Sequence, residues 1–130
     1  MDDTLKIWDI RNQKLHVFEW KDLINMSSKT NVAFSPDEKL VLTGTSVRKG
    51  FGQGLIMAYD AQSGEEIARS AVSQDSVIQV HWQPSINQII VGSADGNIRV
   101  LYDPTLSKRG ITTSLTKLEK RKAIDAFNIV

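Results

Sequence analysis

The chain contains no cysteine among its 130 residues. This absence excludes disulfides and thiolate metal sites, and it is typical of proteins from reducing compartments. No run of about 18 apolar residues occurs, so the sequence predicts no membrane-spanning helix. The acidic start Met1-Asp2-Asp3 does not resemble a signal peptide, and we expect none. The formal net charge of +1 gives no general attraction to nucleic acid or to membranes.

Residues suited to catalysis or metal binding are also few. His16 and His81 are the only histidines, and neither lies in a Glu-x-x-His pattern. A metal site usually needs three or four protein ligands. Nucleophilic catalysis needs a base held beside a Ser, Cys or Thr, with a third group that orients the base. The sequence shows neither arrangement, so we expect a non-catalytic protein with no metal and no cofactor.

What the sequence does have is a unit that occurs three times. Each copy ends in an apolar strand that closes with an aromatic residue and Asp, at Trp8-Asp9, Tyr59-Asp60 and Tyr102-Asp103. The aromatic residues are 51 and 43 positions apart. A repeat of roughly 40–45 residues that closes in Trp-Asp resembles the WD repeat, in which each copy forms one blade of a β-propeller.

Short β-branched and apolar segments alternate with turn residues along the chain, which is typical of an all-β fold. Pro36 and Asp37 mark one turn, and Asp95-Gly96 marks a two-residue hairpin. The segments expected to form strands are 4–9 and 15–20 in the first unit; 30–34, 40–45, 55–60 and 66–72 in the second; and 77–82, 88–93 and 98–102 in the third, with 111–115 as a candidate fourth.

The units predict a partial WD-repeat propeller of about two and a half four-stranded antiparallel blades. We assign a half blade to 1–25, a full blade with a Gly-rich insertion to 26–74, a full or nearly full blade to 75–116, and a basic tail to 117–130. Because such an arc cannot close into a ring, its open strand edges are expected to make the isolated chain self-associate.

The most specific motif in the sequence is Trp8-Asp9-Ile10-Arg11. WD-repeat proteins that act as substrate receptors of cullin-RING ubiquitin ligases often carry Trp-Asp-x-Arg at this point of a blade. The resemblance implies that Arg11 contacts the ligase's linker protein, and arginine suits an interface because its planar guanidinium binds in a bidentate manner. The alternative is that Trp8 packs within the blade, Asp9 caps the turn and Arg11 is a solvated charge.

The second unusual feature is the segment 44–54, which contains four glycines. It resembles a phosphate-binding loop, but a strand follows it instead of the helix that such loops need, so no nucleotide site is expected. Arg48, Lys49 and Phe51 could instead contact RNA or an acidic protein. The alternative, which we favour, is a solvated hairpin that only connects two strands.

Particular stretches resemble the WD-repeat protein 70 (gastrulation-defective-like) family. They are Thr30 to Asp37, Thr43 to Val47 with the insertion, Trp82-Gln83-Pro84, and Tyr102-Asp103-Pro104 followed by Ser107 to Gly110. The resemblance implies the last blades of a longer nuclear protein that is similar to cullin-ligase substrate receptors. It also implies links to chromatin, through histone ubiquitylation, and to genome maintenance, and an alternative role as an RNA-associated splicing component.

Overall fold

The computed structural model describes residues 2–48 and 51–115. Within these ranges the chain forms three antiparallel sheets, which confirms the predicted all-β fold class. The strands are β1 (Leu5–Ile7), β2 (Phe18–Trp20), β3 (Val32–Phe34), β4 (Leu40–Gly44), β5 (Gly54–Asp60), β6 (Glu66–Ser73), β7 (Val77–Gln83), β8 (Gln88–Ser93) and β9 (Ile98–Tyr102).

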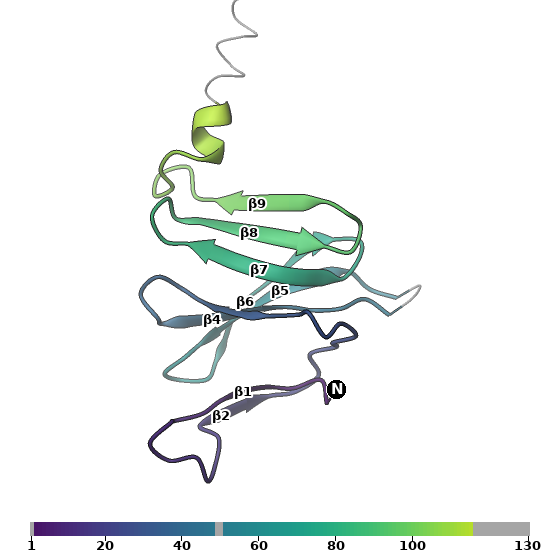
Figure 1. Ribbon diagram of the computed structural model, residues 1–130, viewed down its shortest axis with the longest axis vertical. Coiled ribbons are helices and arrows are strands. Elements are labelled where there is room, and N and C mark those ends of the chain that lie inside the picture. Colours follow the sequence, from purple (N-terminus) through teal and green to yellow (C-terminus); the bar gives the residue numbers. More distant parts are fainter. Residues whose placement is uncertain (1, 49–50, 116–130) are drawn as a thin grey trace, which may run out of the picture.

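The sheets follow one another in chain order, as Figure 1 shows. Their strand orders are β1-β2, β3-β4-β5-β6 and β7-β8-β9, and every neighbouring pair is antiparallel. The first sheet lies in the predicted half blade, the second in the predicted full blade, and the third in the predicted full or nearly full blade. Each sheet is therefore a consecutive hairpin-linked unit, as a propeller requires.

Two apolar clusters hold the sheets together. The larger cluster joins the second and third sheets, and its buried members are Leu42, Ile56, Ala58, Val77, Val80 and Val91. The smaller cluster joins the first and second sheets through Leu23, Met57 and Tyr59. Trp20 on β2 stacks on Tyr59 at 4.6 Å between ring centroids, and its Nε1 donates to the Gly64 carbonyl. The two central strands of the second sheet, β4 and β5, are thus covered on both faces, whereas its edge strands β3 and β6 are largely exposed.

The structure corrects the fourth strand expected over 111–115, because these residues are helical. The carboxamide of Gln88 on β8 donates to the Arg109 carbonyl at 2.9 Å and accepts from the Ile111 N–H at 3.3 Å. Gln88 thus holds the backbone of residues 109–111 beside β8, and within the described residues the third sheet has three strands. The expected strand 15–20 is also shorter, since Leu15 and Val17 are exposed and only 18–20 pair with β1.

Some of the apolar surface is left exposed. Val32 and Phe34 on β3 are about half exposed, and Ile98 and Tyr102 on β9 lie on the uncovered face of the third sheet.

In residues 2–48 and 51–115, no helix combines the length and apolarity that crossing a bilayer demands. The predicted basic tail, 117–130, lies outside the described residues.

Candidate partner-binding surfaces

The turn after β1 presents the Trp-Asp-x-Arg motif. The Asp9 carboxylate accepts three hydrogen bonds from Arg11: from the backbone N–H at 2.9 Å, from Nε at 3.0 Å and from Nη2 at 2.8 Å. The Asn12 N–H donates to the Asp9 carbonyl and closes the turn. Despite these bonds the Arg11 side chain is 86% exposed. The motif therefore holds a guanidinium in a fixed orientation at the surface.

The electrostatics of the pair are mutual. The Arg11 guanidinium holds the pKa of Asp9 below its usual value, and the carboxylate raises the pKa of Arg11. Trp8 is 49% exposed, and its ring meets the His16 ring edge-on at 5.6 Å. His16 in turn lies 3.5 Å from Glu19. Asp9 and Arg11 thus pair with each other, while the neighbouring Trp8 packs on His16 of the loop before β2.

The Gly-rich insertion forms a hairpin between β4 and β5. Arg48 and Phe51 pair across it, with the Phe51 N–H donating to the Arg48 carbonyl at 2.9 Å. Phe51 is 81% exposed, and Arg48 lies 3.9 Å from the Asp3 carboxylate. Lys49, the third predicted residue here, lies outside the described residues. The insertion therefore exposes the aromatic ring of Phe51, while the nearby guanidinium of Arg48 already lies close to the carboxylate of Asp3.

The two predicted groups do not come together. Arg48 lies beside Asp3, which precedes β1, whereas Arg11 follows the end of the same strand. In Figure 1 the turn between β1 and β2 and the hairpin that follows β4 lie at opposite ends of the sheets. A partner that contacts Arg11 and a partner that contacts Phe51 would therefore use different ends of the molecule.

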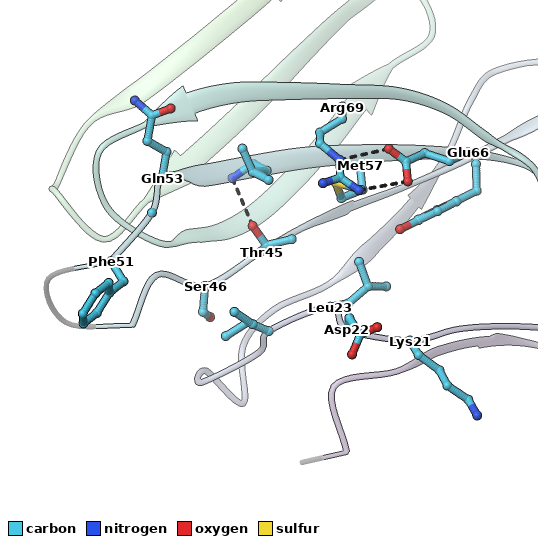
Figure 2. Close-up of a pocket in the computed structure, with 14 residues that line it drawn as sticks. Lys21, Asp22, Leu23, Thr45, Ser46, Phe51, Gln53, Met57, Glu66 and Arg69 are labelled. Carbon is cyan, nitrogen blue, oxygen red and sulfur yellow. Dashed lines mark hydrogen bonds and ion pairs between the residues drawn. The ribbon is translucent and has the colours of Figure 1, made fainter.

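A pocket that the sequence did not indicate lies between the segment after β2 and the insertion hairpin (Figure 2). Its volume is about 420 Å³. Apolar side chains form part of its lining, namely Leu23, Leu55, Met57 and Tyr59, and Phe51 stands at its rim. Its residues are far apart in the sequence and carry no motif, so only the folded chain reveals it.

No group of three or more histidines, aspartates or glutamates lies close enough to bind a metal ion in the part of the chain that the structure describes. His81 pairs with Gln83 at 3.0 Å on its own strand. His16 lies in the loop between β1 and β2, whereas His81 lies on β7.

Consecutive antiparallel sheets that each carry the aromatic-Asp close, at Trp8, Tyr59 and Tyr102, define a WD-repeat protein with a partial propeller. No family model matches the chain. It is 40% identical over 121 residues to WD repeat-containing protein 70 of Xenopus laevis, in an alignment that covers 93% of this chain and 20% of that protein. It is 38% identical over 120 residues to the Bos taurus protein of the same name, covering 92% and 18%.

A third relative is the Gastrulation defective protein 1 homolog of Drosophila melanogaster, at 34% identity over 121 residues, covering 93% of this chain and 18% of that protein. The chain is therefore similar to the WD-repeat protein 70 family over 93% of its length in both alignments, which confirms the resemblance that its sequence motifs predicted. It spans about a fifth of the length of these relatives. WD-repeat proteins are in general non-catalytic scaffolds for protein interaction, and this chain shares their architecture.

Proposed function

We propose that the chain contributes to a substrate receptor of a cullin-RING ubiquitin ligase that acts in the nucleus, in chromatin or genome maintenance. Arg11 then contacts the ligase's linker protein, with Trp8 and Asp9 beside it. The observation that carries the proposal is the Asp9–Arg11 arrangement, in which two side-chain hydrogen bonds orient a guanidinium that remains 86% exposed. A guanidinium that is oriented before binding loses less conformational freedom on association.

Arg11 also keeps donors for a partner. The bonds to Asp9 use Nε and Nη2, and within residues 2–48 and 51–115 no hydrogen bond uses Nη1. Arginine is enriched among the interface residues that contribute most to affinity. A carboxylate of the linker could therefore bind the free side of the guanidinium while Asp9 keeps it in place.

The test is capture of the purified linker protein by the chain and by its variants. Arg11→Ala should weaken capture at least about tenfold, as loss of a central interface arginine does. Arg69→Ala is the matched control, because Arg69 makes the same two-bond contact with Glu66, at 3.0 and 3.1 Å, on β6. If Arg11→Ala captures the linker as well as the unchanged chain does, the proposal is wrong.

Localisation is a separate part of the proposal. The test uses a fluorescently tagged fusion in which this chain replaces the matching segment of a full-length relative. We expect this fusion to accumulate in the nucleus. Uniform cytoplasmic fluorescence would contradict this part and would leave the Arg11 contact to be judged by the capture experiment.

A second candidate function is association with RNA through the insertion, as a component of the splicing machinery. The observation in its favour is that Arg48 and Phe51, one basic and one aromatic, are both exposed on one hairpin. Aromatic stacking and phosphate contacts are the usual means of binding single-stranded RNA. Such binding should weaken steeply with salt and fall with Arg48→Ala. RNA affinity that is absent at low salt would eliminate this candidate.

A further inference from the structure

We infer that the pocket of about 420 Å³ beneath the insertion hairpin is a binding site for a short peptide segment without net charge, which inserts one bulky apolar side chain. The inference rests on the protein-interaction role of the WD-repeat scaffold. It concerns the end of the molecule opposite Arg11, so its failure and the failure of the Arg11 contact give separate results.

The apolar part of the pocket comes from both of its walls. Leu23 follows β2 and packs on Met57 and Tyr59, which lie on the face of the second sheet that looks toward the first sheet. Leu55, on the same face of β5, lines the pocket and is only partly covered. A side chain that covered this floor would remove apolar surface from water, which is the usual source of affinity for an anchor residue.

Two buried hydroxyls supply hydrogen-bond donors. Thr45 and Ser46 line the pocket and are more than nine-tenths buried. The Thr45 Oγ1 accepts from the Leu55 N–H at 3.1 Å, and the Ser46 Oγ accepts from the Met26 N–H at 2.9 Å. Within residues 2–48 and 51–115, neither hydroxyl donates a hydrogen bond. Each therefore keeps its proton for an acceptor from outside, and the carbonyls of a peptide backbone are such acceptors.

Phe51 adds an aromatic edge to the site. It lines the pocket from the tip of the insertion, and its 81% exposure shows that the rest of the chain leaves its ring almost bare. Figure 2 shows Phe51 at one end of the pocket, with Ser46 and Thr45 between it and Leu23, and with Lys21 and Glu66 toward the other end. Exposed aromatic residues beside a hollow are typical of peptide-binding surfaces, because they bury much area at a small cost in conformational entropy.

Positive and negative side chains are equal in number around the pocket, which favours a ligand without net charge. Arg69 is bonded to Glu66 within the lining, and the remaining charged lining residues, Lys21 and Asp22, are adjacent in the chain and opposite in sign. Arg48 on the hairpin faces Asp3. RNA would need an excess of cations to neutralise its phosphates. A neutral peptide needs none, so the surface favours a peptide.

Selection from a displayed library of random short peptides, followed by synthesis of the enriched peptides, tests the inference directly. The expected peptides share one bulky apolar residue and carry no net charge. Phe51→Ala should weaken their binding by about tenfold or more, and Phe51→Trp should restore most of it, because an aromatic ring is what the site uses. Leu106→Ala is the control, since Leu106 is an exposed apolar residue in the turn after β9.

Methyl NMR locates the bound peptide without any substitution. The inference predicts shifts at the methyl groups of Leu23, Leu55 and Met57, and unchanged signals at Leu101 and Leu106 of the third sheet and its exit. The inference is overturned if no peptide is enriched, if Phe51→Ala binds as tightly as the unchanged chain, or if the shifts fall on the third sheet. Tighter binding of a uridine oligonucleotide than of any peptide, lost in Phe51→Ala, would assign the site to RNA and would also overturn it.

Discussion

The side chain of Asn31 forms two hydrogen bonds with the backbone of Val80, on the neighbouring sheet. Its Nδ2 donates to the Val80 carbonyl at 2.9 Å, and its Oδ1 accepts from the Val80 N–H at 2.8 Å. Val80 lies on β7 and is 1% exposed. Because a buried backbone group needs a hydrogen-bond partner, Asn31 takes the place of a paired strand between two sheets that share no ladder.

Asn31→Ala should therefore destabilise the chain. It leaves the donor and the acceptor of Val80 without partners, and each unsatisfied buried group costs on the order of 1–3 kcal/mol. We expect a loss in this range or above it in the free energy of unfolding, measured by denaturant titration. Gln13→Ala removes an exposed carboxamide from the turn after β1 and should change little. Equal stability of the two variants would show that the contact contributes nothing.

Gly54, at the start of β5, is expected to tolerate no side chain. A Cβ at this position would overlap the backbone carbonyl oxygen of Asp75, and backbone atoms cannot move aside as a flexible side chain can. We expect Gly54→Ala to lower the free energy of unfolding by about 1–3 kcal/mol, as overpacking does. Gly92→Ala is the matched control in a strand, because a Cβ there meets no heavy atom within 4 Å. A neutral effect of Gly54→Ala would contradict the packing described here.

The sequence predicted the sheets well where local chemistry decides them. Asp95-Gly96 predicted a hairpin, and the structure places Gly96 at φ 78°, which glycine adopts without strain. Pro36 and Asp37 ended β3 as expected, with the Ser35 and Asp37 side chains bonded at 2.6 Å. These turns are fixed by residues that are adjacent in the chain, so a single sequence contains the information.

Features that depend on contacts between residues far apart in the chain could not be predicted from the sequence. Residues 111–115 include β-branched side chains that suit a strand, yet Gln88 holds the preceding turn and the segment becomes helical. The pocket under the insertion was missed for the same reason, because its lining comes from three separate stretches of the chain. Arg11 and Phe51 are exposed, and their roles in partner binding stay predictions.

Acid should weaken the chain partly through Asp95. Its carboxylate accepts from Arg99 Nη2 at 2.7 Å, from Ser93 Oγ at 2.6 Å and from the Asn97 N–H at 3.0 Å. Arg99 first, and then Ser93 and Asn97, hold the pKa of Asp95 well below its ordinary value. A depressed folded-state pKa gives stability that is present above the unfolded-state pKa, about 3.9, and is lost as the pH falls below it.

Asp95→Asn should therefore unfold at a lower denaturant concentration than the unchanged chain at pH 7, and the difference should shrink as the pH falls below about 4. Asp22→Asn is the control, because Asp22 forms no ion pair within the residues that the structure describes. A difference for Asp95→Asn that stays constant down to strongly acidic pH would show that the charge of this carboxylate is not what stabilises the turn.

The outer edge of β9 is expected to drive association between copies of the isolated chain. In the second sheet, the outer edge of the third strand, β5, pairs with a fourth strand, β6. In the third sheet, within the described residues, no strand pairs with the outer edge of the third strand, β9. β6 carries Glu66 and Arg69 along its length, and charges of this kind discourage edge pairing. β9 instead carries Ile98, an apolar side chain that is 74% exposed.

Light scattering on the isolated chain should give a mass above the 14.5 kDa of one chain. Ile98→Lys should return the mass to one chain, while Ile10→Lys, in a turn, should leave it unchanged, since a lysine blocks pairing only on a strand edge. A monomeric unchanged chain with a sharp melting transition would show that this edge is protected without a partner.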